Sequence, residues 1–247
     1  MSGTGNRPLS GRLALVTGAS RGIGAATARA LGAAGAHVVL TARTEAGLLA
    51  TEEAIHAEGG TATIAPLDLA VGDDIDRLAQ AVAGRWQALH ILVLNAATLG
   101  TLTPVPHETP AGFEAVLRVN LVAPFRLIRA FDPLLRRGRP AAVVAVTSSI
   151  GGRGRAYWGA YAASKAALEN LVETYADEMK ALGVHALIVD PGATRTAMRA
   201  RAFPGEDPAT LKGPETVAEA IVARLAEGLP PGVTRLAVAP RPAALPA

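Results

Sequence analysis

Short apolar runs, rich in β-branched residues, alternate along this chain with longer stretches of helical periodicity. Strands that alternate with helices form βαβ units, so the strands lie parallel and the helices cover both faces of one sheet. The first runs are apolar almost without interruption, as expected for strands buried on both sides. The pattern therefore predicts an α/β protein with a doubly wound parallel sheet. The predicted strands are 13–17, 38–42, 61–66, 91–94, 142–147, 185–190 and 236–238.

The length of the chain suits one domain. It has 247 residues, of which 50% are hydrophobic and 18% charged, which is enough apolar material for a sizeable core. No linker, heptad pattern or internal repeat interrupts the alternation of strands and helices. We therefore expect a single domain over residues 1–247. Residues 1–10 and the proline-rich residues 240–247 are expected to be flexible or interface tails.

Composition excludes several classes of function. Cysteine is absent, which excludes disulfides, thiolate metal sites and a cysteine nucleophile, and the five histidines are too scattered for a local zinc motif. The 24 Lys and Arg against 21 Asp and Glu leave a net charge of +3 spread along the chain, so no nucleic-acid partner is predicted. The longest apolar runs fall well short of the roughly 18 residues of a membrane span. We expect a cytoplasmic protein with a small-molecule substrate, no metal and no membrane partner.

A glycine-rich loop joins the first predicted strand to an alanine-rich helical stretch. Glycines let the backbone approach a diphosphate and a helix amino terminus attracts one, so this order of strand, loop and helix predicts a Rossmann-type dinucleotide site. The spacing G-x-x-x-G-x-G differs from the commoner G-x-G-x-x-G. The candidate cofactor contacts in this loop are Gly18, Ser20, Arg21, Gly22, Ile23 and Gly24.

The second predicted strand indicates which dinucleotide binds. A site for NAD usually has an acid near the end of this strand, which accepts a hydrogen bond from the ribose 2′-hydroxyl. Here residues 40–43 read LTAR, and the first acid is Glu45. The guanidinium groups of Arg43 and Arg21 suit the 2′-phosphate of NADP. NADP is therefore favoured over NAD; the alternative is that Arg43 and Glu45 are plain exposed residues at a helix start.

A tyrosine and a lysine stand four residues apart at the start of the helical stretch 160–182. Residues four apart share a helix face, with Cβ atoms about 5 to 6 Å apart, so the Lys165 ammonium can act on the Tyr161 phenol. A free phenol has a pKa of about 10, and a nearby cation that lowered it by about three units would make the phenol a usable base at neutral pH. The pair is predicted to move the proton while a nicotinamide exchanges hydride. The alternative is an exposed lysine beside a packed tyrosine.

Two further polar residues lie where the fold would bring them to the crevice. Ser148 follows the run 142–147, and the carboxyl ends of strands in open α/β sheets face the ligand, so its hydroxyl can donate to a substrate carbonyl. Ser149 is its rival for that role. Asn120 interrupts an apolar helical pattern, where an amide can also simply bend or cap a helix.

Together these motifs resemble those of the short-chain dehydrogenase/reductase family over nearly the whole chain. Residues 17–24 resemble its T-G-x-x-x-G-x-G cofactor loop, 68–69 its acid beside adenine, 95–97 its N-A-G segment, and 191–196 its P-G-x-x-x-T segment that holds the nicotinamide carboxamide. The catalytic tetrad that the resemblance implies is Asn120, Ser148, Tyr161 and Lys165. The cofactor contacts that it implies, besides the glycine loop and Arg43, are Asp68, Leu69, Asn95, Ala96, Tyr161, Lys165, Pro191, Gly192, Thr194 and Thr196.

The resemblance also implies an architecture and roles. It implies strand order 3-2-1-4-5-6-7 and a homodimer or homotetramer that packs the Tyr161 helix against its neighbour's. Tyr161 would be the acid/base, Lys165 would lower its pKa and bind the nicotinamide ribose, Ser148 would polarise the carbonyl, and Asn120 would hold a water. The chain departs from the family pattern at Leu94, Ala97 and Asp190. Residues 158–165 and 192–212 resemble the YciK-like subgroup of bacterial oxidoreductases.

The resulting hypothesis is an NADP(H)-dependent oxidoreductase that interconverts a carbonyl and a secondary alcohol. Two alternatives stay open: a 3-oxoacyl carrier-protein reductase, and a catalytically silent NADP(H)-binding regulator or scaffold. The segments 98–110, 151–158 and 197–212 are expected to form the substrate walls, the last as a mobile lid. Apolar residues there either line the pocket or pack in the core: Ile150, Tyr157, Trp158, Met198 and Phe203. Arginines there either meet an anionic substrate or are solvated: Arg153, Arg155, Arg199 and Arg201.

Overall fold

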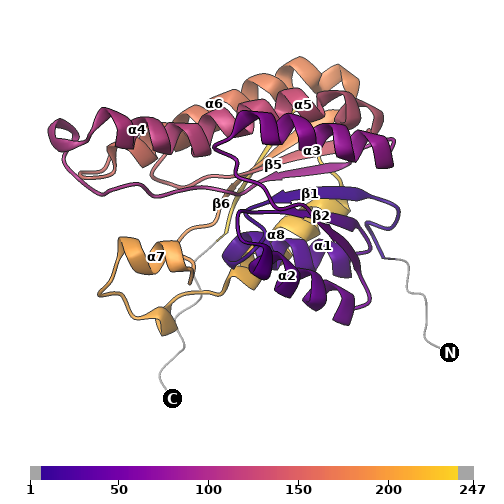
Figure 1. Ribbon diagram of the computed structural model, residues 1–247, viewed down its shortest axis with the longest axis horizontal. Helices are drawn as coiled ribbons and strands as arrows, with labels where there is room; N and C mark the ends of the chain where they lie inside the picture. Colours follow the sequence, from indigo (N-terminus) through magenta and orange to yellow (C-terminus); the bar gives the residue numbers. More distant parts are fainter. Residues whose placement is uncertain (1–6, 239–247) are drawn as a thin grey trace.

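The computed structural model describes residues 7–238, which form a seven-stranded parallel sheet with helices on both faces (Figure 1). The sheet order is β3-β2-β1-β4-β5-β6-β7, so the predicted doubly wound fold and its strand order are confirmed. Every predicted strand is present within three residues of its expected ends. The strands are β1 (Leu13–Thr17), β2 (His37–Thr41), β3 (Thr61–Ile64), β4 (Ile91–Leu94), β5 (Ala141–Val146), β6 (Val184–Asp190) and β7 (Val233–Ala237).

Two apolar clusters hold the helices to the sheet. Along β1, Leu13 and Leu15 belong to one cluster while Ala14 and Val16 belong to the other, which explains why the strand is apolar without alternation. One face carries α1 (Gly22–Ala33), α2 (Glu45–Ala57) and α8 (Pro214–Glu227), and the other carries α3 (Gly72–Arg85), α5 (Ala123–Arg137) and α6 (Gly159–Met179) (Figure 1).

The carboxyl ends of the central strands define where ligands bind. The strand order reverses between β1 and β4, and in open α/β sheets such a switch point opens a crevice beyond the strand ends. The elements added to the simple alternation are α4 (Pro110–Leu117), a π-helix (Arg118–Val122), α7 (Ala197–Ala202) and the 3₁₀ turns Val105–His107, Lys180–Leu182 and Pro208–Thr210.

Two details differ from the sequence-based expectation. Strand β7 begins at Val233 rather than residue 236, because this edge strand alternates exposed and half-buried positions and includes the polar Thr234 and Arg235. Residues 7–10, counted with the amino-terminal tail, form a turn on the domain: Leu9 is 3% exposed and its N–H donates to Ala34 O at 2.9 Å. Residues 1–6 and 239–247 of the expected tails lie outside the described residues.

Two features of residues 7–238 bear on membrane and metal binding. None of their helices combines the length and the apolar character that a membrane span requires. Nor do they contain a group of three or more His, Cys, Asp or Glu side chains arranged to hold a metal ion.

Candidate active site

The glycine loop brings backbone, not side chains, to the end of β1. Gly18 and Gly22 have φ of +66° and +58°, a left-handed conformation that L side chains rarely adopt. A Cβ on Gly24 would lie 2.2 Å from Gly18 O, so the first turn of α1 packs directly on the loop. All three glycines are therefore required by the backbone path, and the resulting cradle fits a diphosphate.

The amino terminus of α1 faces this cradle uncapped. Its N-cap residue, Arg21, makes no side-chain capping hydrogen bond, and the first turn contains no acid. The free N–H groups and the helix dipole favour an anion there. A Cβ on Gly47 of α2 would lie 2.7 Å from Ser20 Cβ, so the start of α2 is pressed against the glycine loop.

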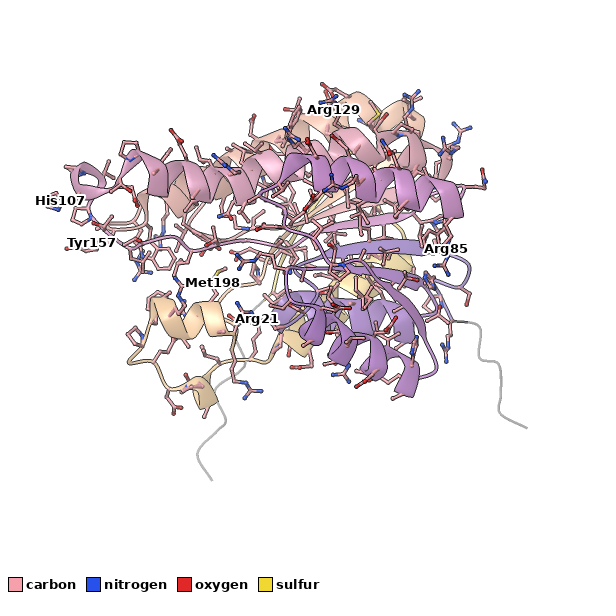
Figure 2. All side chains as sticks on the ribbon, viewed as in Figure 1. Arg21, Arg85, His107, Arg129, Tyr157 and Met198 are labelled. Carbon is pink, nitrogen blue, oxygen red and sulfur yellow. The ribbon has the colours of Figure 1, made fainter. Side chains whose placement is uncertain are left out.

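Two arginines flank this contact. Arg43 precedes α2 and Arg21 lies in the loop; both are exposed, and neither forms an ion pair among residues 7–238. Arg21 lies at the end of the molecule occupied by Met198 of α7, away from Arg85 (Figure 2). The donor set thus fits a phosphate beyond the diphosphate cradle, as the 2′-phosphate of NADP would require.

Polar side chains lock the loop to the sheet. Thr17 Oγ1 donates to Val93 O at 3.0 Å and accepts from the N–H groups of Asn95 and Ala96. Asn95 Nδ2 donates to Thr17 O at 2.9 Å. The side chain of Asn95 therefore holds β4 against the glycine loop. Any contact of this segment with a cofactor would be made by groups other than the Asn95 Nδ2 amide.

Tyr161 and Lys165 lie one turn apart on α6, as the spacing predicted. They are 8% and 2% exposed, and the Lys165 ammonium is 5.7 Å from the centre of the Tyr161 ring. Lys165 Nζ donates to Val146 O at 2.8 Å, which ties α6 to the end of β5. The interpretation of Lys165 as an exposed lysine is thereby excluded.

The direction of the tyrosine's pKa shift is opposite to the expected one. Burial, with a smaller contribution from the Asp190 carboxylate, raises the pKa of Tyr161 to about 12. Burial also lowers the pKa of Lys165 to about 8, against the opposing effect of Glu169. The expectation that one ammonium keeps the phenol partly ionised is wrong for this structure, because desolvation outweighs the neighbouring charge. At neutral pH the Tyr161 hydroxyl is therefore protonated.

Asn120 sits in the π-helix between α4 and α5 and is 0% exposed. Its Oδ1 accepts from Thr98 N at 2.8 Å, and its Nδ2 donates to Thr98 O at 2.9 Å and to Ser164 Oγ at 3.0 Å. Ser164 in turn donates to Tyr161 O. The side-chain amide thus positions the segment after β4 and the start of α6, and the expected role of Asn120 in holding a water stays a prediction.

Other predicted site residues lie on turns that follow the carboxyl ends of strands β3, β5 and β6. Ser148 follows β5 and is half-buried, with Oγ 3.4 Å from Ile150 N, whereas its rival Ser149 is exposed. Asp68 Oδ1 accepts from Ala70 N at 2.9 Å, which shapes its own turn beside the buried Leu69. Thr194, 3% exposed, donates to Pro191 O at 3.0 Å.

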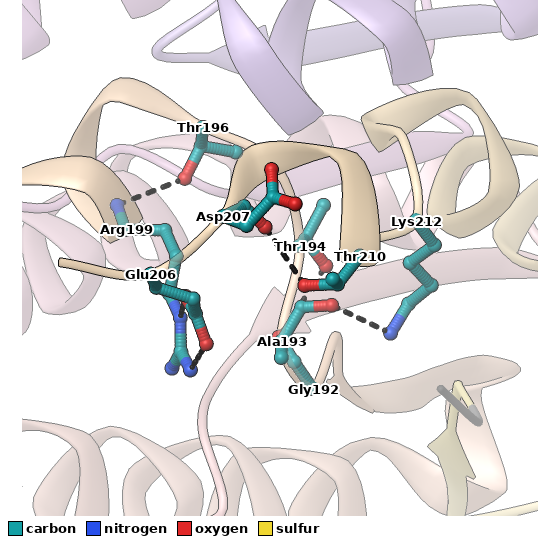
Figure 3. Close-up of polar contacts among 9 residues, drawn as sticks. All are labelled: Gly192, Ala193, Thr194, Thr196, Arg199, Glu206, Asp207, Thr210 and Lys212. Carbon is teal, nitrogen blue, oxygen red and sulfur yellow. Dashed lines mark hydrogen bonds and ion pairs between the residues drawn. The ribbon is translucent and has the colours of Figure 1, made fainter. Parts of the chain in front are cut away.

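Thr196 connects the two halves of the crevice. Its Oγ1 accepts from Arg199 N at 3.2 Å and so caps α7, while its methyl lies 3.5 Å from where a Cβ on Gly22 would be (Figure 3). The glycine loop and the segment 191–196 therefore face each other, as the cofactor-binding prediction requires.

Comparison with known proteins decides the family. A model of the short chain dehydrogenases matches residues 12–207. The chain belongs to this family. It is 40% identical over 213 residues to the oxidoreductase YciK of Escherichia coli strain K12, across 85% of this chain and 84% of that protein. The predicted YciK-like resemblance is confirmed.

Two other relatives of this short-chain dehydrogenase bear on its cofactor and substrate. A short chain dehydrogenase from Shigella flexneri 2a strain 301, crystallised in complex with NADP, has a TM-score of 0.86 at 35% identity, over 95% of this chain and 99% of that one. A 3-oxoacyl-(acyl-carrier-protein) reductase from Synechocystis sp. is 33% identical over 192 residues, or 77% of each protein.

Sequence reasoning gave no role to Lys212. It is 3% exposed, its Nζ donates to Ala193 O at 3.2 Å, and its own carbonyl accepts from Arg195 N (Figure 3). It closes the base of the segment 195–211 against the residues expected to contact nicotinamide. The scarcity of lysine could have pointed to it: of the three lysines in the chain, Lys165 and Lys212 are the buried ones.

Proposed function

We propose that this short-chain dehydrogenase is an NADPH-dependent reductase that converts a carbonyl to a secondary alcohol. The observation that carries the proposal is a protonated phenol, buried beside an equally buried ammonium, at the carboxyl end of β5. A reduction consumes a proton at the carbonyl oxygen, so a site that keeps its tyrosine protonated suits this direction.

NADPH, when bound, supplies the hydride to the carbonyl carbon. The chain would hold its diphosphate with the glycine loop and the α1 amino terminus, and its 2′-phosphate with Arg43 and Arg21. Support comes from the uncapped helix, the two unpaired guanidinium groups and the NADP complex of the Shigella relative. We assign Asp68, Leu69, Ala96, Pro191, Gly192 and Thr196 to the walls of the same site.

Tyr161 gives its hydroxyl proton to the carbonyl oxygen, which leaves a phenolate. Lys165 lies close enough for its ammonium to stabilise that phenolate, so the charge that fails to ionise the resting phenol helps in the reaction itself. Ser148 is assigned the hydrogen bond that holds the carbonyl in place. Asn120 is assigned a positioning role through Thr98 and Ser164.

The test is oxidation of NADPH across ketones, aldehydes, quinones and acyl thioesters with Tyr161→Phe and Tyr175→Phe. Tyr175 is a matched control, since it is also buried on α6 but its hydroxyl donates to Asp132. We expect Tyr161→Phe to lose about 100-fold or more in kcat while it still binds NADPH, and Tyr175→Phe to keep its activity.

The alternatives predict other outcomes in the same screen. Activity confined to acetoacetyl thioesters would favour the carrier-protein reductase, to which the Synechocystis relative lends support. NADPH binding without turnover of any carbonyl, unchanged by Tyr161→Phe, would refute the reductase in favour of a binding protein.

A further inference from the structure

An aromatic cluster lies beside the proposed proton donor. It consists of Trp158 and Tyr161 at the start of α6 and Phe203 at the end of α7. The ring centres of Trp158 and Tyr161 are 5.8 Å apart, and those of Trp158 and Phe203 are 5.7 Å apart. Leu99, Ile150 and Met198 pack around these rings. A substrate carbonyl that meets Tyr161 would therefore have its remaining carbon skeleton against apolar surface.

Two arginines lie on this cluster, and they differ in their charge partners. Arg199 is 3.7 Å from the centre of the Phe203 ring, and its guanidinium is paired with Glu206 through two hydrogen bonds of 2.5 Å (Figure 3). Arg155 is 5.6 Å from the Trp158 ring centre and 5.1 Å from that of Phe203. Arg155 has no ion pair with any residue of 7–238.

The two carboxylates that follow α7, those of Glu206 and Asp207, already accept hydrogen bonds. Glu206 is held by Arg199, and Asp207 Oδ1 accepts from Ala209 N at 2.9 Å. The apolar surface under Arg155 reduces the solvation of its guanidinium on that side, which strengthens its attraction for an anion compared with a fully hydrated charge. A cation–π contact accounts for where Arg155 lies, but it leaves the positive charge uncompensated.

We propose that Arg155 binds a carboxylate of the substrate. The substrate class is then a ketone or aldehyde whose carbonyl and carboxylate are separated by roughly one aromatic ring or a chain of similar length, because the Trp158 ring contacts both Tyr161 and the Arg155 guanidinium. A single unpaired guanidinium matches the single charge of a carboxylate. This inference rests on the proposed reductase for the position of the carbonyl.

The kinetic test uses a charged and a neutral substrate of the same shape, 4-acetylbenzoate and 4-acetylbenzamide, with NADPH. We expect Arg155→Met to lower kcat/KM for the benzoate about 10- to 100-fold, mainly through KM, and to leave the benzamide unchanged. Arg153→Met is the control, since it removes the same charge from the same exposed loop and, among the described residues, Arg153 forms no cation–π contact with these rings. Equal losses in the two variants would indicate a diffuse field and overturn the site.

A binding measurement separates this inference from the proposed function. Calorimetry with 4-isopropylbenzoate and its amide, which contain no ketone or aldehyde to reduce, is run on the protein saturated with NADP⁺. Preferential binding of the benzoate, lost in Arg155→Met and retained in Arg153→Met, supports the anion site even if no ketone is turned over. If ketones are reduced but the benzoate binds no better than the amide, the anion site is wrong and the reductase stands. Absence of benzoate binding at millimolar concentration likewise overturns the site.

Discussion

At the scale of single residues, the site contains one buried charged group, the Lys165 ammonium, whose charged form is destabilised by burial. Lys165 is 2% exposed, and its ammonium hydrogen-bonds one carbonyl, that of Val146, among the described residues. Such a group keeps its proton less tightly in the folded protein than in the unfolded chain, so it costs stability at neutral pH. We therefore assign Lys165 a role in the proposed reaction, in which its charge stabilises the phenolate that forms on Tyr161.

The cost predicts a pH dependence of stability. The pKa of Lys165 falls from 10.5 in the unfolded chain to about 8 in the fold, so between these values the unfolded chain binds more protons and stability rises with pH. Relative to Lys165→Met, the wild type should gain on the order of 3 kcal/mol in unfolding free energy across this window. Urea denaturation of both proteins from pH 7 to pH 10.5 measures the difference. Parallel curves would show that Lys165 is not desolvated.

We assign the cofactor preference to Arg43. Arg43→Asp replaces a phosphate partner with an acid suited to the ribose 2′-hydroxyl. We expect the Kd for NADPH to rise about 10- to 100-fold while that for NADH changes little, measured by nucleotide fluorescence. Arg129→Asp, an exposed position on α5 without an ion pair among the described residues, is the matched control for charge. Equal weakening of both nucleotides by Arg43→Asp would contradict the assignment.

At the scale of elements, the π-helix positions α6. It widens one turn between α4 and α5 and places Asn120 where one amide satisfies both the N–H and the C=O of Thr98 and also reaches Ser164. Helical periodicity predicted a helix through this region but could not reveal the wide turn, because the extra residue is specified by these distant partners. The same limit explains why the contacts of Asn120 with Thr98 and Ser164 were not predicted from the sequence.

The contribution of the Asn120 side chain to the free energy of unfolding can be measured. Asn120→Ala leaves two backbone groups of the half-buried Thr98 without their amide partner, so we expect a loss of about 2 to 4 kcal/mol in unfolding free energy at an unchanged m value. Asn170→Ala, at an exposed position of α6, should change the unfolding free energy by less than about 0.5 kcal/mol. A loss for Asn120→Ala no larger than this control would mean that water replaces the amide.

At the scale of the whole molecule, the sequence predicted the sheet better than the site. Strands buried on both faces are recognisable from continuous apolar runs, and the largest error, a start predicted three residues late, is at the edge strand β7, whose polar positions hide the pattern. The glycine loop and the Tyr161–Lys165 pair were predictable because their partners are local. The pKa of Tyr161 and the role of Lys212 were not, because both depend on what packs around a side chain from distant segments.

The family resemblance also implies that this protein forms a homodimer or homotetramer. Val122 ends the π-helix and Phe125, three residues later, lies at the start of α5. Their side chains are 43% and 47% exposed, which fits a surface that a second subunit covers in a homodimer or homotetramer. We expect Phe125→Glu to shift the protein towards monomer in sedimentation velocity. Leu49→Glu on α2, where leucine is 41% exposed, should leave the association unchanged. A monomeric wild type would contradict this assignment.

The pairing of Thr194 with Lys212 has a consequence for how such proteins diversify. After β6 the chain passes Thr194 and returns beside it at Lys212, so residues 195–211 form a closed loop that begins and ends outside the strands. Such a loop can differ in length and sequence between related proteins without altering the sheet. Substrate selectivity can therefore change while the residues proposed to transfer the proton stay the same.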